Sequence, residues 1–153
     1  GLAKVTRESK MLVCADESVS SLRDAKRLIK TKAAGAINIK FMKAGILEAY
    51  EIAHLAKRNG IRLMIGTMME TPLAVTAAAH FAAGFGGFDF VDLDAPFFMA
   101  ENVTRGSFVT RSGVYDLGKV KAGIGVVPVR SSQPSVFDRG ASKPNPGCCA
   151  RKV

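Results

Sequence analysis

The stretch Ile37-Asn38-Ile39-Lys40-Phe41-Met42-Lys43 decides how the rest of the chain is interpreted. It has the pattern of a short buried strand that ends in a lysine. Because side chains alternate across a strand, Ile37 and Ile39 share one face while Asn38 and Lys40 share the other. A buried ammonium group is costly unless it is paired or takes part in chemistry. Lys40 is therefore either an edge-strand lysine that reaches into solvent or a proton-transfer group at the carboxyl end of a strand.

Working outward from this stretch, apolar runs of strand length alternate with helical patterns along residues 11–95. The first helical pattern opens with Ser21 and Asp24, which resemble a capping box. This alternation predicts βα units and a parallel sheet, an α/β fold. The expected strands span residues 11–15, 36–40, 61–65 and 88–93, and the expected helices begin near residues 21, 45 and 72.

Each expected strand ends at a polar residue, namely Asp16, Lys40, Thr67 and Asp92, at intervals of 24, 27 and 25 residues. In a (β/α)₈ barrel the carboxyl ends of all strands converge on one catalytic face. In an open doubly wound sheet, ligands also bind beyond the strand ends, at a switch point. Four consecutive polar strand ends favour the barrel. The sequence predicts about four βα units, which is half of the eight in a complete barrel. On that face Asp92 and Asp94 are expected to point inward, while Val91 and Leu93 pack on helices.

Beyond Pro96 the alternation stops. Residues 106–117 are expected to form a short hairpin, and residues 120–129 one more strand. From Arg130 onward Ser, Pro, Gly and Arg dominate, which predicts a disordered, basic tail. The expected domains are therefore a partial barrel over residues 1–129 and a flexible tail over residues 130–153.

Composition excludes several classes of protein. The net charge is +9, but the basic residues are scattered singly, so nucleic-acid binding is not expected. No apolar run reaches the roughly 18 residues of a membrane span, so no membrane association is expected. The three cysteines form neither a disulfide framework nor a metal-binding spacing.

The start at Gly1-Leu2 reads like the middle of a longer chain. A cytoplasmic location is expected, with a plastid or another organelle as the alternative.

Four motifs in order resemble the enolase superfamily, in its muconate-lactonizing subgroup, and within it the dipeptide epimerases. They are Asp16-Glu17-Ser18, Asn38-Ile39-Lys40 with Lys43, Gly66-Thr67-Met68-Met69-Glu70 and Asp92-Leu93-Asp94-Ala95-Pro96. The resemblance covers roughly residues 8–127. Each motif is weak alone, but four of them at barrel spacing are specific. The resemblance implies the C-terminal half of a (β/α)₈ barrel and interconversion of L-Ala-D-Glu and L-Ala-L-Glu by 1,1-proton transfer through an enediolate.

The resemblance also implies a role for each matching residue. Asp16 would be the third carboxylate ligand of Mg²⁺, at the end of the fifth barrel strand. Lys40 would be the acid/base on one face of the substrate Cα. A divalent cation stabilises the negative charge that proton removal creates, and a lysine base requires a lowered pKa, which a nearby metal and burial would supply.

The small dipeptide substrate would be held by the last two motifs. Thr67 and Met69 would line it near the seventh strand. Asp92 and Asp94 would bind its α-ammonium group at the end of the eighth. This carboxylate pair distinguishes the epimerases best, because muconate cycloisomerases and o-succinylbenzoate synthases handle no such amine.

Departures from the family pattern limit what this chain would do alone. The N-terminal capping domain, a Lys-x-Lys motif and two further metal carboxylates are missing, and Ala44-Gly45 stands where the family usually shows Ala-Gly-Gly. The chain by itself is therefore expected to be inactive in epimerisation. The alternatives are another enzyme of the same subgroup, or a non-catalytic half-barrel that acts by association. A further alternative is that the chain forms a homo-oligomer through its unpaired barrel edges.

Other candidate residues are assigned lesser roles. Glu17 is interpreted as either a metal ligand or a side chain that supports one. Lys43 is interpreted as either a surface residue or a residue that supports the site. Glu70 is expected to orient a neighbour across the barrel mouth. His80 is expected to pack with a satisfied ring, and His54 to be exposed.

Overall fold

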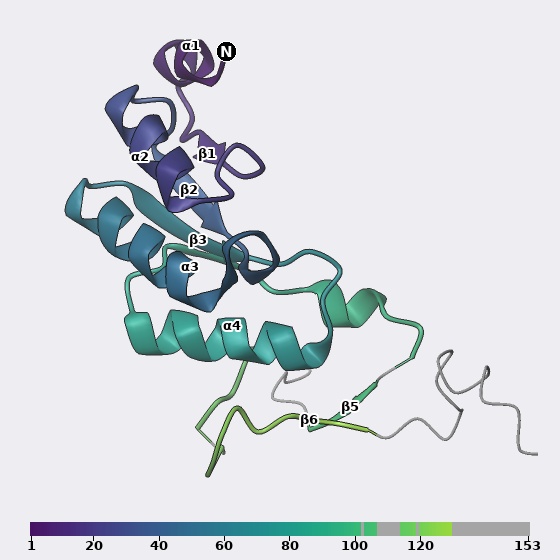
Figure 1. The fold of residues 1–153 in the computed structure, drawn as a ribbon. Helices are drawn as coiled ribbons and strands as arrows, with labels where there is room; N and C mark the ends of the chain where they lie inside the picture. Colours follow the sequence, from purple (N-terminus) through teal and green to yellow (C-terminus); the bar gives the residue numbers. More distant parts are fainter. Residues whose placement is uncertain (102, 107–113, 119, 130–153) are drawn as a thin grey trace, which may run out of the picture.

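The computed structural model describes residues 1–101, 103–106, 114–118 and 120–129. Its centre is a four-stranded parallel sheet in the order β1-β2-β3-β4 (Figure 1). The strands are β1 (Cys14–Ala15), β2 (Ala36–Ile39), β3 (Arg62–Gly66) and β4 (Phe90–Asp92). The helices are α1 (Leu2–Glu8), α2 (Leu22–Lys30), α3 (Phe41–Arg58), α4 (Pro72–Phe85) and the 3₁₀ helix η1 (Ala95–Phe98). A separate antiparallel pair joins β5 (Thr104–Arg105) to β6 (Val127–Pro128).

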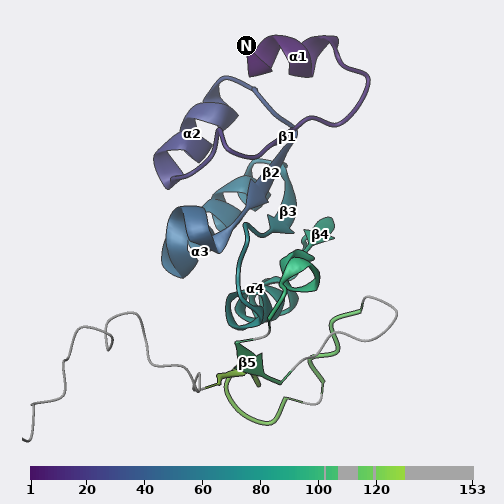
Figure 2. The ribbon, with the colours of Figure 1, turned by 90° about the vertical axis from the view of Figure 1, so that its right-hand side faces the viewer.

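Each strand of the main sheet pairs with the next strand along the chain, and a helix connects each pair. Helices α2 and α3 lie on one side of strands β1–β3, and α4 lies below α3 (Figure 2). The strand order follows the chain without reversal. A segment of a barrel has this order, whereas a doubly wound sheet reverses its strand order at a switch point. The expected fold class, four parallel βα units of a half-barrel, is confirmed.

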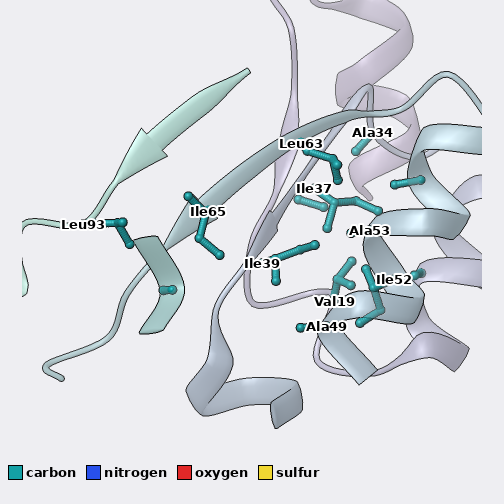
Figure 3. Packing of buried hydrophobic residues seen from close by; sticks show 14 of the residues in the cluster. Val19, Ala34, Ile37, Ile39, Ala49, Ile52, Ala53, Leu63, Ile65 and Leu93 are labelled. Carbon is teal, nitrogen blue, oxygen red and sulfur yellow. The ribbon is translucent and has the colours of Figure 1, made fainter. Parts of the chain in front are cut away.

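The core lies between this sheet and the helices. Ile37 pairs in register with Leu63, and Ile39 with Ile65, so four large side chains form adjacent rows on the helix-facing side. All four are at most 3% exposed, and the α3 side chains Ala49, Ile52 and Ala53 pack into the same cluster (Figure 3). Burying a side chain of this size contributes roughly 1.5–3 kcal/mol. The opposite side of these two strands carries the alternate register pairs, Ala36 with Arg62 and Asn38 with Met64.

Local signals explain where two helices begin. The Ser21 hydroxyl accepts a hydrogen bond from the Asp24 amide, as the capping box predicts, and it also donates one to the Asp24 carboxylate. Helix α3 starts at Phe41 rather than near Gly45. A first turn over residues 41–44 is interrupted at Gly45, whose φ of 70° and ψ of 173° are not helical. The regular helix continues beyond this glycine.

Several expected boundaries are wrong. Helix α1 lacks any apolar spacing strong enough to predict it, and it is tied down by a hydrogen bond from the Thr6 hydroxyl to the Ala33 carbonyl. The first strand begins at Cys14, because Met11 and Leu12 are 81% and 45% exposed and pair with no strand. Only Val127–Pro128 of the strand expected at 120–129 forms, and it pairs with Thr104–Arg105.

Two expectations fall partly or wholly outside the described residues. The hairpin expected at 106–117 includes residues 107–113, and the tail expected at 130–153 lies beyond the last described residue. Across the described ranges, none of the helices has the length and apolar character to cross a bilayer.

Candidate functional site

The sheet brings the four polar strand-end residues to one edge. Asp16 directly follows β1, Lys40 follows β2, Thr67 follows β3, and Asp92 is the last residue of β4. The register pairs Ala15 with Ile37, Ile39 with Ile65, and Gly66 with Asp92 in parallel strands. All four residues therefore lie at the carboxyl edge of the sheet, where barrel enzymes place their chemistry.

Lys40 lies at the centre of this edge and is 9% exposed. Its Nζ lies 2.8 Å from Asp16 Oδ2 and donates a hydrogen bond of 3.3 Å to Glu17 Oε1. The same Nζ lies 3.9 Å from the thioether sulfur of Met68. The alternative of an edge-strand lysine reaching into solvent is wrong, because Lys40 is buried and paired.

Asp16 is held from three directions. Its Oδ2 contacts Lys40 and accepts a hydrogen bond of 3.1 Å from Asn38 Nδ2, while its Oδ1 accepts one of 2.9 Å from Lys43 Nζ. Burial acts to raise the pKa of this carboxyl, but the hydrogen bonds from Lys40 and Lys43 outweigh burial and lower the pKa to about 2. Asp16 is thus a fixed carboxylate at neutral pH.

The pKa of Lys40 is raised in this metal-free arrangement, and the lowered value expected beside a bound metal stays a prediction. Burial acts to lower the pKa, but the hydrogen bonds and negative charges of Asp16 and Glu17 favour the ammonium form more strongly. In this arrangement the protonated, positively charged form of Lys40 is favoured. Acting as a base requires that the charge of the neighbouring carboxylates be compensated by something else.

Lys43 is not a surface residue, so that alternative is wrong. Its side chain is 7% exposed, and Nζ donates to the Asp16 carbonyl at 2.7 Å and to the Asn38 carbonyl at 3.1 Å, in addition to the Asp16 carboxylate. The side chain therefore connects the first turn of α3 to the ends of β1 and β2. This leaves the supporting role.

Glu70 is 5% exposed and closes the site from the β3–α4 loop. Burial raises the pKa of the Glu70 carboxyl. Hydrogen bonds from the Met68 and Met42 backbone amides and the nearby charge of Lys40 act to lower this pKa, but burial has the larger effect. These two amides belong to the loop after β3 and to the first turn of α3. Glu70 therefore joins the loop after β3 to the first turn of α3, and the orienting role expected for it stays a prediction.

The candidate substrate residues are less closely gathered. Asp92 and Asp94 are exposed, with Leu93 buried at 4% between them. Leu93 packs in the core as expected, but Val91 does not, because it is 60% exposed at the rim of an open groove beside α4. Thr67 is half-buried, and Met69 is 68% exposed.

Sequence reasoning missed two neighbours of Lys40 and Asp16. Met68, which received no role of its own in the sequence analysis, is the methionine that contacts Lys40. Asn38 holds Asp16, and the available signal was its alternation onto the Lys40 face. Of the histidines, His80 contacts the Ile124 carbonyl at 3.2 Å, whereas His54 is half-buried against Tyr50 and Phe85 rather than exposed.

The side chains around Lys40 offer few ligands for a divalent cation. Asp16 has a carboxylate side chain that is 39% exposed, so it can serve as one oxygen ligand. In the described part of the chain, however, no group of three or more His, Cys, Asp or Glu side chains is placed to hold a metal ion. These residues alone therefore do not make a complete Mg²⁺ site.

Comparisons with known proteins agree with this geometry. The family model for the enolase C-terminal domain-like proteins matches residues 1–132, and the chain belongs to this family. It is 53% identical over 131 residues to a hydrophobic dipeptide epimerase from Citrifermentans bemidjiense, covering 84% of this chain and 36% of that protein. It is 46% identical over 126 residues to an aromatic dipeptide epimerase from Herpetosiphon aurantiacus, covering 82% and 35%.

Solved structures give the same result. A substrate-liganded L-Ala-D/L-Glu epimerase from Bacillus subtilis matches with a TM-score of 0.75 and 40% identity, over 83% of this chain and 35% of that one. A dipeptide epimerase from Cytophaga hutchinsonii, complexed with Mg and D-Ala-L-Val, matches with a TM-score of 0.78 and 30% identity, over 86% and 36%. The chain thus spans about a third of the length of the relatives it matches.

Proposed function

We propose that this chain carries the Lys40 half of the active site of a dipeptide epimerase. The observation that supports this most is the buried Lys40 ammonium, 2.8 Å from the Asp16 carboxylate at the carboxyl edge of a parallel half-barrel. A proton donor fixed at this point can deliver a proton to one face of a substrate Cα. Inversion requires a second acid/base on the other face, which the described residues do not supply.

The dipeptide is the proposed substrate because of the two carboxylates at the end of β4. Asp92 and Asp94 are exposed at the site edge and separated by one buried residue, so both are accessible to a cationic ligand. A free α-ammonium group is the cation that a dipeptide offers. Thr67 and Met69 are proposed to line the remainder of the substrate, with Met68 beside Lys40.

Magnesium is the proposed cofactor. Asp16 would supply one oxygen ligand, and the other ligands would come from outside the described residues. A bound Mg²⁺ would neutralise negative charge on the substrate carboxylate. Asp16 is already a carboxylate at neutral pH, so no proton has to be removed from it before it binds a cation.

A chimeric enzyme tests this proposal. Residues 1–129 would replace the matching segment of the Bacillus subtilis epimerase, which they resemble at 40% identity. The chimera is assayed in D₂O with Mg²⁺ and either L-Ala-L-Glu or L-Leu-L-Tyr. We expect formation of the epimer with deuterium at Cα, its loss in Lys40→Met, and full retention in the exposed-surface control Lys30→Met.

The Asp92→Asn and Asp94→Asn chimeras separate the dipeptide proposal from its alternatives. If both raise KM for dipeptides with a smaller change in kcat, the carboxylates bind the ammonium group. A folded chimera that turns over neither dipeptide would contradict the epimerase assignment. It would favour another reaction of the same superfamily, such as cycloisomerisation or o-succinylbenzoate synthesis, or a half-barrel that acts only by association. A cytoplasmic location is proposed on the basis of the expected class alone.

A further inference from the structure

We propose that Lys43 is a positioning residue, which fixes the orientation of the Asp16 carboxylate and thereby the place of Lys40. This inference rests on the proposed function for its catalytic meaning. The positioning itself is a structural claim that can be tested without turnover.

The first argument is the number and direction of the contacts. Lys43 Nζ donates to Asp16 Oδ1 at 2.9 Å, to the Asp16 carbonyl at 2.7 Å and to the Asn38 carbonyl at 3.1 Å. An ammonium group has three protons, so these acceptors use all of its donors. Two of the acceptors are backbone atoms at strand ends. Lys43 therefore holds the carboxylate relative to the sheet, and not only relative to another mobile side chain.

The second argument is the division of the Asp16 oxygens. Lys43 takes Oδ1, while Lys40 and Asn38 Nδ2 both contact Oδ2, at 2.8 and 3.1 Å. With one oxygen held from the α3 side and the other from β2, the carboxylate cannot rotate about its χ2 angle without breaking a contact. Since Oδ2 is the oxygen that meets Lys40, the hold on Oδ1 also sets where Lys40 can rest.

The third argument is the space around Asn38. Its side chain is 5% exposed, and its Oδ1 has no hydrogen-bond partner among the described residues, so the amide orientation is set by its Nδ2 bond to Asp16. A Cβ atom on Gly66 would lie 2.6 Å from that oxygen. The Asn38 amide therefore fills the space that glycine leaves at the end of β3. This packing opposes any movement of Asp16 away from β2.

The fourth argument is burial and charge. The Lys43 side chain is 7% exposed, less than the 11% of Lys40, although the proposed chemistry assigns Lys43 no proton to transfer. Burying an ammonium group is costly without full pairing. The cluster of Lys40, Lys43, Asp16 and Glu17 carries two positive and two negative charges, and Lys43 faces only the Asp16 member of the carboxylate pair. A fully paired, buried ammonium group of this kind fits a positioning residue.

The test is NMR of the full chain, labelled to observe the Asp16 carboxylate carbon and the Lys40 Nζ group. The variants are Lys43→Met, which keeps the aliphatic chain, and Lys43→Gln, which is neutral and too short for three contacts. Lys30→Met, an exposed lysine on α2, is the matched control. Backbone amide spectra and thermal melts establish which variants are folded, and the decision is taken on those.

We expect the Asp16 carboxylate signal to shift and the Lys40 Nζ signal to broaden or disappear in the Lys43 variants, while Lys30→Met leaves both in place. In the chimera, Lys43→Met should lower kcat roughly 10- to 100-fold with little change in KM, as losses of outer supporting contacts do. Unchanged Asp16 and Lys40 signals in a folded Lys43 variant would overturn the inference, even if the chimera is active. Shifted signals with an inactive chimera would instead contradict the proposed function and leave the positioning intact.

Discussion

At the scale of single residues, the site is a small network of opposite charges around Asp16. Lys40 and Lys43 contact different oxygens of the same carboxylate, and Asn38 completes its hydrogen bonding. The side chains of Lys40 and Lys43 are only 11% and 7% exposed, whereas the side chain of Asp16 is 39% exposed. The network therefore leaves the carboxylate partly exposed.

The acid stability of the metal-free chain should depend on Asp16. Its pKa falls from the ordinary 3.8 to about 2 on folding, so its charged form favours the folded state. That contribution is present above pH 3.8 and is lost as the pH falls through about 2. Urea unfolding midpoints measured between pH 2 and 6 with a chelator present should decline less steeply in Asp16→Asn than in the wild type. Parallel curves would show that Asp16 makes no such contribution.

Gly66→Ala should destabilise the fold by about 1–3 kcal/mol, the range for overpacking a buried site. The new Cβ would meet the Asn38 side-chain oxygen at 2.6 Å, and Asn38 is buried and bonded to Asp16. The matched control is Gly84→Ala in α4, where a Cβ meets nothing within 4 Å and alanine should stabilise the helix by about 0.5–1 kcal/mol. Equal stabilities of the two variants in urea would contradict this account.

At the scale of elements, the interruption of α3 is what allows Lys43 to point back toward β1. Residues 41–44 form one turn, and Gly45 then takes φ 70° and ψ 173°, a region of backbone conformation that is nearly restricted to glycine. The turn carries both Met42, whose amide bonds Glu70, and Lys43, which bonds Asp16. One glycine therefore determines how the first turn of α3 meets the site.

Gly45→Ala should cost about 1–3 kcal/mol, because a side chain is strained in this conformation although the Cβ itself would meet nothing within 4 Å. If the backbone relaxes to a continuous helix instead, Lys43 turns away from Asp16. The free energy of unfolding and the Asp16 carboxylate signal, measured on the same variant, distinguish the two responses. A variant with unchanged stability and an unchanged Asp16 signal would show that the interruption is not needed.

At the scale of the whole molecule, the part of the chain that the structure describes is built around a four-stranded sheet with two unpaired edges. Within the described residues β1 pairs only with β2, and β4 only with β3. The chain covers 36% of the length of the Citrifermentans bemidjiense relative.

The chain alone should not epimerise dipeptides. In the proposed mechanism Lys40 would serve only one face of Cα, and the described residues contain no cluster of three acidic, His or Cys side chains for Mg²⁺. Incubation with Mg²⁺ and L-Ala-L-Glu in D₂O, followed by separation of the epimers, should give no L-Ala-D-Glu. Slow incorporation of deuterium without inversion is compatible with a lone acid/base. Inverted product that disappears in Lys40→Ala would prove this prediction wrong.

Self-association through the strand edges stays a prediction. Unpaired strand edges readily pair with other chains, and Val91 near one edge is 60% exposed. Sedimentation velocity over a range of concentrations should show dimers or larger species. A charged substitution, Val91→Lys, should shift the population toward monomer, while Lys30→Met should not. A monomer at all concentrations would exclude this route.

What the sequence determined by itself was the order of elements and the identity of the strand-end residues. Period-two alternation in residues 36–40 and the spacing of Asp16, Lys40, Thr67 and Asp92 were sufficient, because the pleat and the βα unit follow from local patterns. The tertiary structure alone decided that Lys43 is buried, that Met68 rather than Met69 meets Lys40, and that the pKa of Lys40 is raised. These depend on which side chains from separate strands meet at one edge, and the distance between atoms in space is not encoded in the spacing along the chain.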